Sequence, residues 1–370
     1  MHFSVMVPVK VPVITDEAIQ RAEAAKAYIA AMQQIPEQSD KNLMDSVILR
    51  CNLQHALSIS TPFASAVEEA VAEVMEPYSQ DTEDPRFCEF EDETEDLQNA
   101  FKRDTMECIS YNGKYYGLRH FKNFRKCSDG VIREITDSGK EFLSAKAQQM
   151  MVVTIPVKEF YGTFRKYAKE RAYYCKEEKA WGYWHNPMCF WDWYSIGGRW
   201  NYGLLVKEDC EDIVGGIPGA GVKDDSAPAA PPGYKWTSAA RKKDIYPEEM
   251  TKWSIATTRA RYDKYAAMWN GTEPLGEDID RKADGLYYWG SCIFDPTKSI
   301  DDVLASNDFR PETAISRYFH AYLDTVNTTP GDGEYGYYDS DGSNNWEQDF
   351  NEFWDSIEDD DVIVTVDCHM

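Results

Sequence analysis

The alternating apolar patterns near the two ends of the chain constrain its fold most strongly. Residues 3–9 read FSVMVPV and residues 362–368 read VIVTVDC, so apolar side chains recur at every second position in both stretches. Because successive side chains of a strand point to opposite faces, each stretch predicts a β-strand with one apolar face and one polar face. We expect both strands to be tied into the core of the fold.

The polar faces of these two strands carry the first candidate site. The polar positions of the first strand are His2 and Ser4, and those of the second are Thr365, Asp367 and His369. If the strands lie in one sheet, His2, Asp367 and His369 converge on its polar side. An Asp beside a His fixes the tautomer of the imidazole for acid–base chemistry or metal ligation. The same residues also fit the solvated face of an antiparallel sheet, and the sequence leaves both interpretations open.

The rest of the chain mixes helices and strands. The periodicity of the apolar residues separates the two, and Asn112-Gly113 between two β-rich runs is typical of a type I′ hairpin. The expected helices cover residues 16–34, 61–77, 157–178, 246–268, 298–305, 311–325 and 346–357. The expected strands cover residues 106–111, 114–119, 150–155, 203–207 and 286–293. Because no βαβ regularity is present, we predict an α+β fold with a mixed or largely antiparallel sheet that includes both terminal strands and is flanked by helices.

The length of 370 residues suits two domains or one elaborate domain. We predict an N-terminal α/β region over residues 1–120, with an acidic insertion at about 79–97. A Trp-rich α+β region over residues 121–370 follows and is closed by the C-terminal strand. One composite domain is the alternative. Residues 213–233 are rich in Gly, Pro and Ala, which predicts a surface loop.

The negative charge is concentrated in two windows. The net charge is −25, and residues 81–96 hold nine acids and one Arg, while residues 332–361 hold twelve acids and neither Lys nor Arg. A field of one sign repels nucleic-acid phosphates, so direct nucleic-acid binding is not expected. The same field attracts a basic protein surface, including one that normally holds DNA. Solvated acidic faces that keep the protein soluble are the simpler alternative.

The cysteine pattern and the lack of long apolar segments predict a location in the cytoplasm. Nine cysteines are scattered without any CxxC spacing, which favours reduced thiols in the cytoplasm over a disulfide framework or a zinc finger. No window is apolar enough to span a membrane, and the N-terminus lacks the features of a signal peptide. We predict no metal site, no cofactor and no membrane partner. The sequence is compatible with a homo-oligomer.

The stretch NPMCFWDWYSIGGRWNYG, residues 186–203, crowds aromatic side chains around one Asp, one Arg and a glycine pair. In one interpretation an aromatic cage holds a planar anionic ligand such as a nucleotide. In the other, the same residues form a Trp-rich packing cluster in which an Asp192–Arg199 pair fixes a tight turn. His185, just before this stretch, is a further candidate general base or a surface turn residue. The candidate ligand-binding residues are Trp191, Asp192, Trp193, Tyr194, Arg199 and Trp200.

Residues 186–200 also resemble a motif, roughly NPxxxWDWYxIGGRW, of a group of phage and prophage proteins with no established activity. The opening MHFSVMV and the closing Val366-Asp367-Cys368-His369 resemble the two ends of the same proteins. The resemblance covers about 18 residues plus these short ends, and Cys189-Phe190 stand where the group has a small residue and Lys. It implies a virus-associated protein of the host cytoplasm and no particular reaction.

Two function classes remain. The first, which we favour at this stage, is a phage-encoded interaction protein that binds and inhibits a host defence protein by presenting a DNA-like acidic surface. The second is an enzyme for a nucleotide or another small molecule, in which Arg199 and the aromatics of residues 190–194 hold the ligand and the histidines act as acid and base. The familiar signatures HExxH, GxSxG and GxxxxGK[ST] are missing from the sequence, which lowers the odds of an enzyme.

Overall fold

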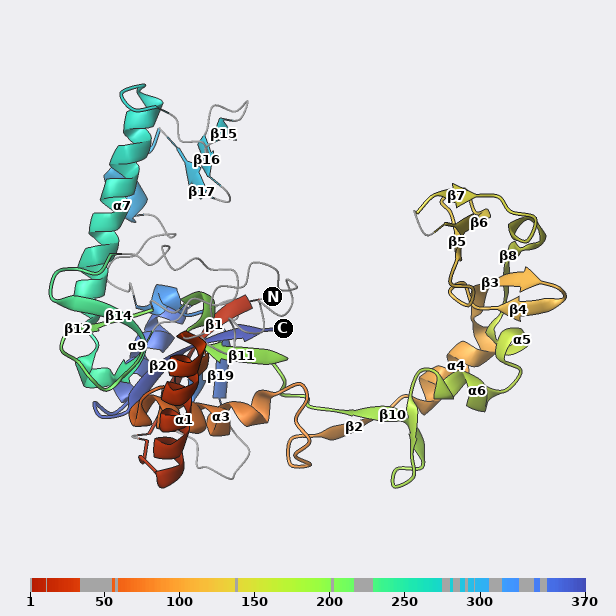
Figure 1. Ribbon diagram of the computed structural model, residues 1–370, viewed down its shortest axis with the longest axis horizontal. Coiled ribbons are helices and arrows are strands. Elements are labelled where there is room, and N and C mark those ends of the chain that lie inside the picture. Colours follow the sequence, from red (N-terminus) through yellow and green to blue (C-terminus); the bar gives the residue numbers. More distant parts are fainter. Residues whose placement is uncertain are drawn as a thin grey trace. The chain divides into compact units, whose positions relative to one another are not determined.

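The computed structural model shows an α+β protein with mixed, mostly antiparallel sheets, which confirms the predicted fold class (Figure 1). The described residues are 2–10, 12–33, 55–56, 59–136, 139–200, 203–215, 229–274, 280–281, 287–289, 292–295, 297–305, 315–325, 336–339 and 345–370. Most of the predicted loop 213–233 lies outside the described residues, as does part of the acidic window 332–361.

The chain divides into two compact units. Unit 1 comprises residues 1–82 and 188–370, and unit 2 comprises residues 83–187. The division differs from the boundary predicted near residue 120, because strands on the two sides of that position pair with each other. Strand β3 (Thr105–Tyr111) is hydrogen-bonded along its length to β8 (Met151–Pro156).

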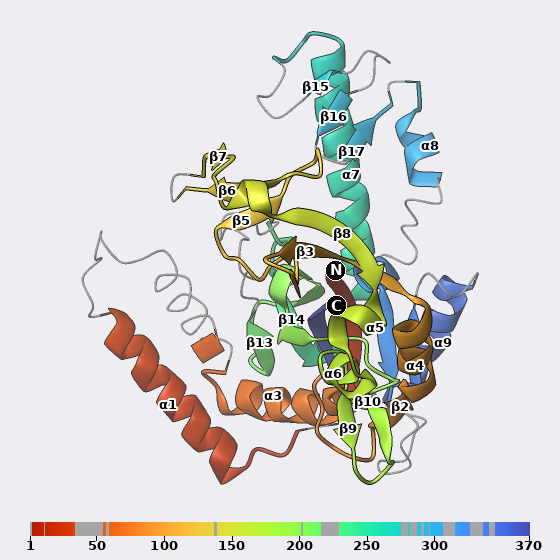
Figure 2. The ribbon, with the colours of Figure 1, turned by 90° about the vertical axis from the view of Figure 1, so that its right-hand side faces the viewer.

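Unit 1 is built on a central sheet of eight strands. The path of neighbours runs β12-β14-β20-β1-β18-β19, with β11 paired to β20 and β13 paired to β14. The N- and C-terminal strands are neighbours inside this sheet, as predicted, and the two chain ends lie side by side in both views (Figures 1 and 2). Only the β1–β18 pair among these described strands is parallel. The strands are β1 (His2–Val9), β11 (Trp193–Ile196), β12 (Leu204–Lys207), β13 (Ile213–Gly215), β14 (Tyr234–Arg241), β18 (Ala321–Asp324), β19 (Gly336–Asp339) and β20 (Val362–His369).

Helices cover both faces of the central sheet. The odd-numbered valines of β1 and the even-numbered valines of β20 pack against α3 (Pro62–Met75) in one apolar cluster. On the opposite face, Met6 and Ile363 belong to a second cluster with α9 (Trp346–Ser356). Beyond Met6, toward residue 2, this second face becomes polar. One face of the β1–β20 pair is therefore packed in the core along the whole length of both strands. The other face is packed only in its middle, and polar side chains occupy the end near residue 2.

The other elements of unit 1 surround this sheet. Helix α1 begins after Thr15, whose Oγ1 accepts a hydrogen bond from the Ala18 N–H at 3.0 Å, so Thr15 is the N-cap of this helix. A separate three-stranded sheet has the order β15-β16-β17. The elements are α1 (Asp16–Gln33), η1 (Glu76–Tyr78), η3 (Gly198–Trp200), η5 (Lys242–Asp244), α7 (Pro247–Trp269), β15 (Asp280–Arg281), β16 (Tyr287–Trp289), β17 (Cys292–Phe294), α8 (Ile300–Ala305) and η7 (Ser316–Tyr318).

Unit 2 contains three sheets of three strands each, with the orders β2-β10-β9, β4-β3-β8 and β5-β6-β7. The predicted hairpin at Asn112-Gly113 is confirmed, since both residues have the positive φ of a type I′ turn, 51° and 71°. The remaining elements are β2 (Glu89–Asp92), α4 (Thr94–Arg103), β4 (Lys114–Tyr116), β5 (Phe124–Lys126), β6 (Ile132–Ile135), β7 (Glu141–Phe142), η2 (Ala147–Gln149), α5 (Val157–Tyr161), α6 (Phe164–Lys169), β9 (Tyr173–Cys175) and β10 (Ala180–His185).

Two predicted helices are wrong. The helix expected at residues 157–178 is two short helices and a strand, because Gly162 ends α5 at φ 71° and residues 173–175 pair with β10. The helix expected at residues 311–325 contains instead the buried strand β18, whose pairing with β1 and β19 overrides its helical pattern.

Smaller differences concern two further stretches. The single strand expected at residues 286–293 is a hairpin of β16 and β17. The acidic insertion expected as a loop at residues 79–97 holds the strand β2 and the first turn of α4. In both cases the strands are only three or four residues long, which is below the length at which periodicity identifies an element.

Candidate functional site

Asp367 is the centre of the polar end of the central sheet. Its side chain is only 2% exposed, and its Oδ1 lies 2.9 Å from Nδ1 of His2. Its Oδ2 accepts a hydrogen bond from the backbone N–H of Arg199 at 2.9 Å. The β1–β20 register explains this arrangement, because it pairs Ser4 with Asp367 and His2 with His369. His2, Asp367 and His369 therefore meet on one face, as the sequence indicated.

A second carboxylate holds the second histidine. Nδ1 of His369 lies 2.8 Å from Oδ1 of Asp192, and the Asp192 N–H donates to the His369 carbonyl at 2.9 Å. This hydrogen bond to His369 lowers the pKa of Asp192 below its ordinary value, so Asp192 is an ionised acceptor. Asp192 directly precedes β11, which pairs with the end of β20 and thereby brings the two residues together.

The two imidazoles are in contact with each other and with one exposed tryptophan. The ring centroids of His2 and His369 lie 4.8 Å apart. The Trp193 ring stacks on His369 at 5.4 Å and meets His2 edge-on at 5.1 Å. In both histidines Nδ1 is bound to a carboxylate, which leaves Nε2 as the ring nitrogen available to a ligand. Adjacent imidazoles oriented in this way are suited to give and to take a proton.

The glycine pair positions Arg199 at this site. Gly197 and Gly198 have φ values of 75° and 52°, and a Cβ at Gly198 would lie 2.4 Å from Oδ2 of Asp367. Only glycine allows the turn to approach Asp367 so closely. The Asp192–Arg199 pair suggested by the sequence does not form, because Asp192 is bound to His369. The Arg199 side chain is exposed, and none of the described residues forms an ion pair with it.

The aromatic cage suggested by the sequence is split between two faces. The Nε1–H of Trp191 donates to the carbonyl of Met75 at 3.1 Å, and Phe190 packs on Tyr78 in the core. Tyr194 packs against the same core cluster, and burial raises its pKa to about 12. Among the aromatics of residues 190–194, Trp193 is therefore the one on the histidine side. Strand alternation in β11 places Trp193 and Tyr194 on opposite faces, whereas Trp191 precedes β11 and is held on the core side by its hydrogen bond to Met75.

A third histidine, which the sequence analysis missed, lies on the same polar face. Nδ1 of His320 is 2.8 Å from Oγ of the buried Ser4, and the His320 N–H donates to the Ser4 carbonyl at 2.8 Å. The Trp200 ring contacts His320 at 5.5 Å. We call the group His2, Ser4, Asp367, His369 and His320 the histidine face. The only signal for His320 was its place before a short apolar run that resembled a helix.

His185 belongs to unit 2, whereas the histidine face belongs to unit 1. Its Nε2 lies 3.7 Å from Oε2 of Glu91, and its ring contacts Tyr183. Both partners are exposed side chains of the β2-β10-β9 sheet. His185 is thus part of a surface ion pair rather than of the candidate acid–base site.

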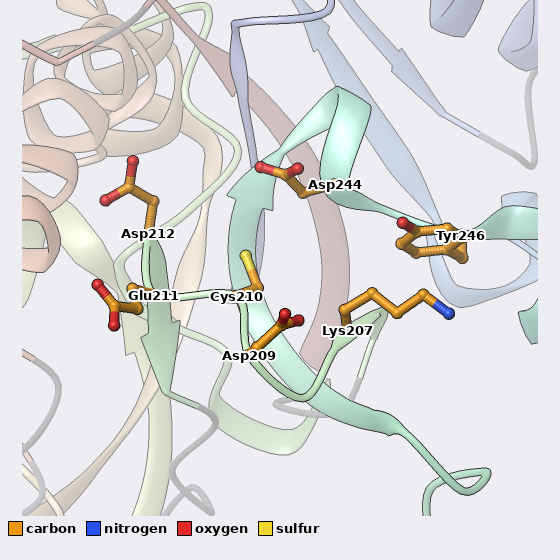
Figure 3. A pocket seen from close by; sticks show the side chains of 7 residues that line it. All are labelled: Lys207, Asp209, Cys210, Glu211, Asp212, Asp244 and Tyr246. Atoms are coloured by element: carbon orange, nitrogen blue, oxygen red, sulfur yellow. The ribbon is translucent and has the colours of Figure 1, made fainter.

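A pocket of about 600 Å³ lies in unit 1 near the ends of β12 and β13 (Figure 3). Its lining is mostly acidic, and the Lys207 ammonium lies 3.8 Å from the Tyr234 ring centroid. Asp212 is already paired with Arg241 at 3.1 Å. The pocket offers carboxylates and one thiol but no imidazole, so the histidine face remains the better candidate. The lining residues are Lys207, Asp209, Cys210, Glu211, Asp212, Asp244 and Tyr246.

Within the described residues, no group of three or more His, Cys, Asp or Glu side chains is arranged to hold a metal ion. None of the helices in the described ranges is long and apolar enough to cross a membrane. Comparisons with protein families, with curated proteins and with solved structures find no match to this chain. The function must therefore be argued from the geometry of the histidine face itself.

Proposed function

We propose that the histidine face is the acid–base centre of an enzyme that acts on an anionic small molecule. One observation carries the proposal: two neighbouring imidazoles, 4.8 Å apart, are each held at Nδ1 by a separate carboxylate. A structural role would not require both rings to be fixed through the same nitrogen by separate carboxylates. Paired Asp–His groups are how proteins set the tautomer of a catalytic imidazole.

The two histidines would share the proton work of a substitution reaction. The neutral imidazole takes a proton at Nε2 from the attacking group, and the protonated imidazole gives its proton to the leaving group. Each adjacent carboxylate accepts the Nδ1–H bond of its histidine and thereby keeps Nε2 as the nitrogen that exchanges the proton. Histidine suits both roles because its ordinary titration range lies near neutral pH.

The surroundings of the two rings support an anionic ligand with a planar part. The Trp193 side chain is 44% exposed and lies against both rings, so it offers a surface on which a base or another ring can stack. Arg199 places a guanidinium that forms no ion pair with the described residues on a turn whose backbone is bound to Asp367. A chain with a net charge of −25 repels anions in general, so an anion site needs such a local cation.

The test is an activity screen with defined chromogenic probes: p-nitrophenyl acetate, p-nitrophenyl phosphate and bis-p-nitrophenyl phosphate. We expect turnover of at least one probe, and a loss of about 10²–10⁴-fold in kcat/KM for His2→Asn and for His369→Asn. His185→Asn is the matched control, since it removes an imidazole beside a carboxylate in unit 2, and its activity should equal that of the wild type. Full activity of both His2→Asn and His369→Asn would refute the proposal.

A second candidate function is the interaction protein suggested by the charge pattern. The observation in its favour is β2, an edge strand of sequence EFED whose side chains are mostly exposed. Among the described residues, His185 is the one basic group that pairs with its acids. In this candidate a phage-encoded chain acts in the host cytoplasm and blocks a basic surface of a host defence protein. The second acidic window, residues 332–361, belongs to unit 1.

The second candidate predicts a partner that depends on the charge of β2. Tagged wild type and a Glu89→Gln/Glu91→Gln/Asp92→Asn variant would be used to capture host proteins at low and high salt, with mass spectrometry of the eluates. We expect one host protein that the wild type retains at low salt and releases at high salt, and that the variant does not retain. Identical eluates from the two chains would count against this function.

A further inference from the structure

The position of His320 extends the histidine face along β1. Strands β1 and β18 are parallel with Val5 opposite Ala321, so Ser4 and His320 are neighbours on the two strands. Ser4 in turn lies opposite Asp367 on β20. The third imidazole therefore lies on the same face as the first two, two residues along β1 from His2. Two residues of a strand span about 7 Å, which is comparable to the size of a small ligand.

His320 is held differently from the other two histidines. The backbone N–H of Ser4 lies 3.2 Å from Nδ1 of His320, and a backbone N–H can only donate. The Ser4 hydroxyl, which also lies against the Tyr318 carbonyl, can turn its proton to Nδ1, and both Ser4 groups then favour the tautomer that carries its proton on Nε2. His2 and His369 donate Nδ1–H to carboxylates, so their neutral forms have a lone pair on Nε2. The face thus combines two imidazoles that accept a proton with one that donates a hydrogen bond.

Arg199 lies on the loop that joins these parts. Its backbone N–H is bound to Asp367, and the next residue, Trp200, contacts the ring of His320 at 5.5 Å. The ring of contacts His320–Ser4–Asp367–Arg199–Trp200 closes on itself. The backbone of Arg199 therefore lies within this ring, and its exposed side chain, which pairs with none of the described residues, is long enough to reach a ligand bound at His320.

We propose that His320 and Arg199 bind a phosphate group, so that the substrate of the two carboxylate-held imidazoles is a phosphate ester. This inference rests on the acid–base function proposed above and adds the substrate class. Phosphate oxygens accept hydrogen bonds from N–H donors, and a guanidinium can bind two of them at once. Carboxylic esters and amides lack the negative charge that would require Arg199.

The reaction that follows from this assignment is hydrolysis of a phosphodiester. One imidazole takes a proton from water as the water oxygen forms a bond to phosphorus. The other imidazole gives its proton to the alkoxide oxygen as the bond between that oxygen and phosphorus breaks. The products are a phosphate monoester and an alcohol, and no oxidant or reductant is needed. His320 and Arg199 would hold the non-bridging oxygens throughout.

The test measures binding of inorganic phosphate to the full chain by NMR of 15N-labelled imidazoles and by calorimetry. We expect His320 to show the Nε2–H tautomer and to shift on addition of phosphate. The Kd for phosphate should rise about tenfold or more in His320→Ala and in Arg199→Gln. It should rise much less in His320→Gln, whose amide can still donate a hydrogen bond. His185→Ala is the control and should bind phosphate as the wild type does.

The outcomes separate this inference from the acid–base function. Phosphate binding that depends on His320 and Arg199 supports the subsite even if no probe is turned over. Turnover that requires His2 and His369, together with a phosphate Kd unchanged by His320→Ala and Arg199→Gln, overturns the subsite and leaves the acid–base function standing. An Nδ1–H tautomer of His320, or no phosphate binding by the wild type at millimolar concentrations, also overturns it. Arg199→Gln changes only an exposed side chain and should not disturb folding. A loss of phosphate binding in this variant therefore cannot be ascribed to misfolding, even if the His320 variants fold poorly.

Discussion

The histidine face and the β2-β10-β9 sheet both place Trp, His and carboxylate side chains on neighbouring antiparallel strands, yet they differ in how the carboxylates are held. Asp367 is 2% exposed and lies 2.9 Å from His2. Glu91 is 49% exposed and lies 3.7 Å from His185. In the first region the carboxylate accepts from the His2 ring and from a backbone N–H, whereas in the second it is half-exposed and accepts from the Tyr183 hydroxyl at 2.6 Å. Burial therefore leaves Asp367 no alternative to its protein partners, whereas the exposed Glu91 can exchange His185 for water.

Glycine substitutions test this comparison with the largest expected effect. Gly198→Ala would introduce a Cβ 2.4 Å from the Asp367 carboxylate at a residue with φ +52°. We expect a loss of about 2–5 kcal/mol in the free energy of unfolding, from backbone strain together with the clash. Gly130→Ala in unit 2 is the control, since φ there is +80° but nothing lies within 4 Å of the added Cβ. It should cost about 1–2 kcal/mol.

Hydrogen exchange read separately in each unit is the appropriate measurement, because two units need not unfold in one transition. Protection should fall in the central sheet for Gly198→Ala and only around the turn for Gly130→Ala. Equal losses in the two variants would mean that Asp367 is not closely enclosed by the glycine turn.

Replacing one carboxylate by an amide in each region should change the free energy of unfolding by an intermediate amount. Asp367 accepts from two donors, the His2 ring and the Arg199 backbone, and an amide at this position would face one of them with its own N–H₂ group. Asp367→Asn should therefore cost about 1–3 kcal/mol of stability. Glu91→Gln should change stability by less than about 0.5 kcal/mol, because the side chain is exposed. Denaturant titration of both variants provides the measurement, and a Glu91→Gln loss as large as that of Asp367→Asn would break the contrast between the regions.

The smallest expected effect concerns the pH dependence of stability that Asp192 and Asp129 contribute. It compares one aspartate from each unit. His369 lowers the pKa of Asp192, and Arg133 lowers that of Asp129 in unit 2 to about 2. In each case the pKa in the folded protein is below the ordinary aspartate value. The ionised carboxylate therefore stabilises the fold at pH values above the ordinary pKa, and this stabilisation is lost as the pH falls through the pKa of the folded protein. Carboxyl 13C NMR should show the pKa of Asp192 rising in His369→Asn while that of Asp129 stays unchanged. An Asp192 pKa unaffected by His369→Asn would contradict the hydrogen bond.

The sequence predicted part of the histidine face because strand alternation is a local property. The positions of His2, Asp367 and His369 on one face follow from two short patterns and one pairing. The same rule, applied to residues 193–196, would have separated Trp193 from Tyr194, but it gives Trp191 and Trp193 the same face and could not have separated these two. An Asp192–Arg199 pair was one of the alternatives that the sequence left open, and it does not form because Asp192 is bound to His369.

The rest of the face depends on contacts that no local pattern contains. Asp192 meets His369 across 177 residues of chain, and Ser4 meets His320 across 316. His320 was hidden because β18 is only four residues long and is buried on both faces, so its composition resembles a helix as much as a strand. Its identity as a strand comes from pairing with β1.

The central position of β20 has a consequence for the order of events during synthesis. Strand β1 is made first, but its antiparallel neighbour in the sheet follows only about 350 residues later, as the register of His2 with His369 requires. Unit 2 is one continuous stretch of the chain and can fold while β1 still waits for this neighbour. A nascent chain would therefore carry a folded insert between two unfinished halves of its sheet. The histidine face can be assembled only after residues 362–369 have been synthesised and have paired with β1.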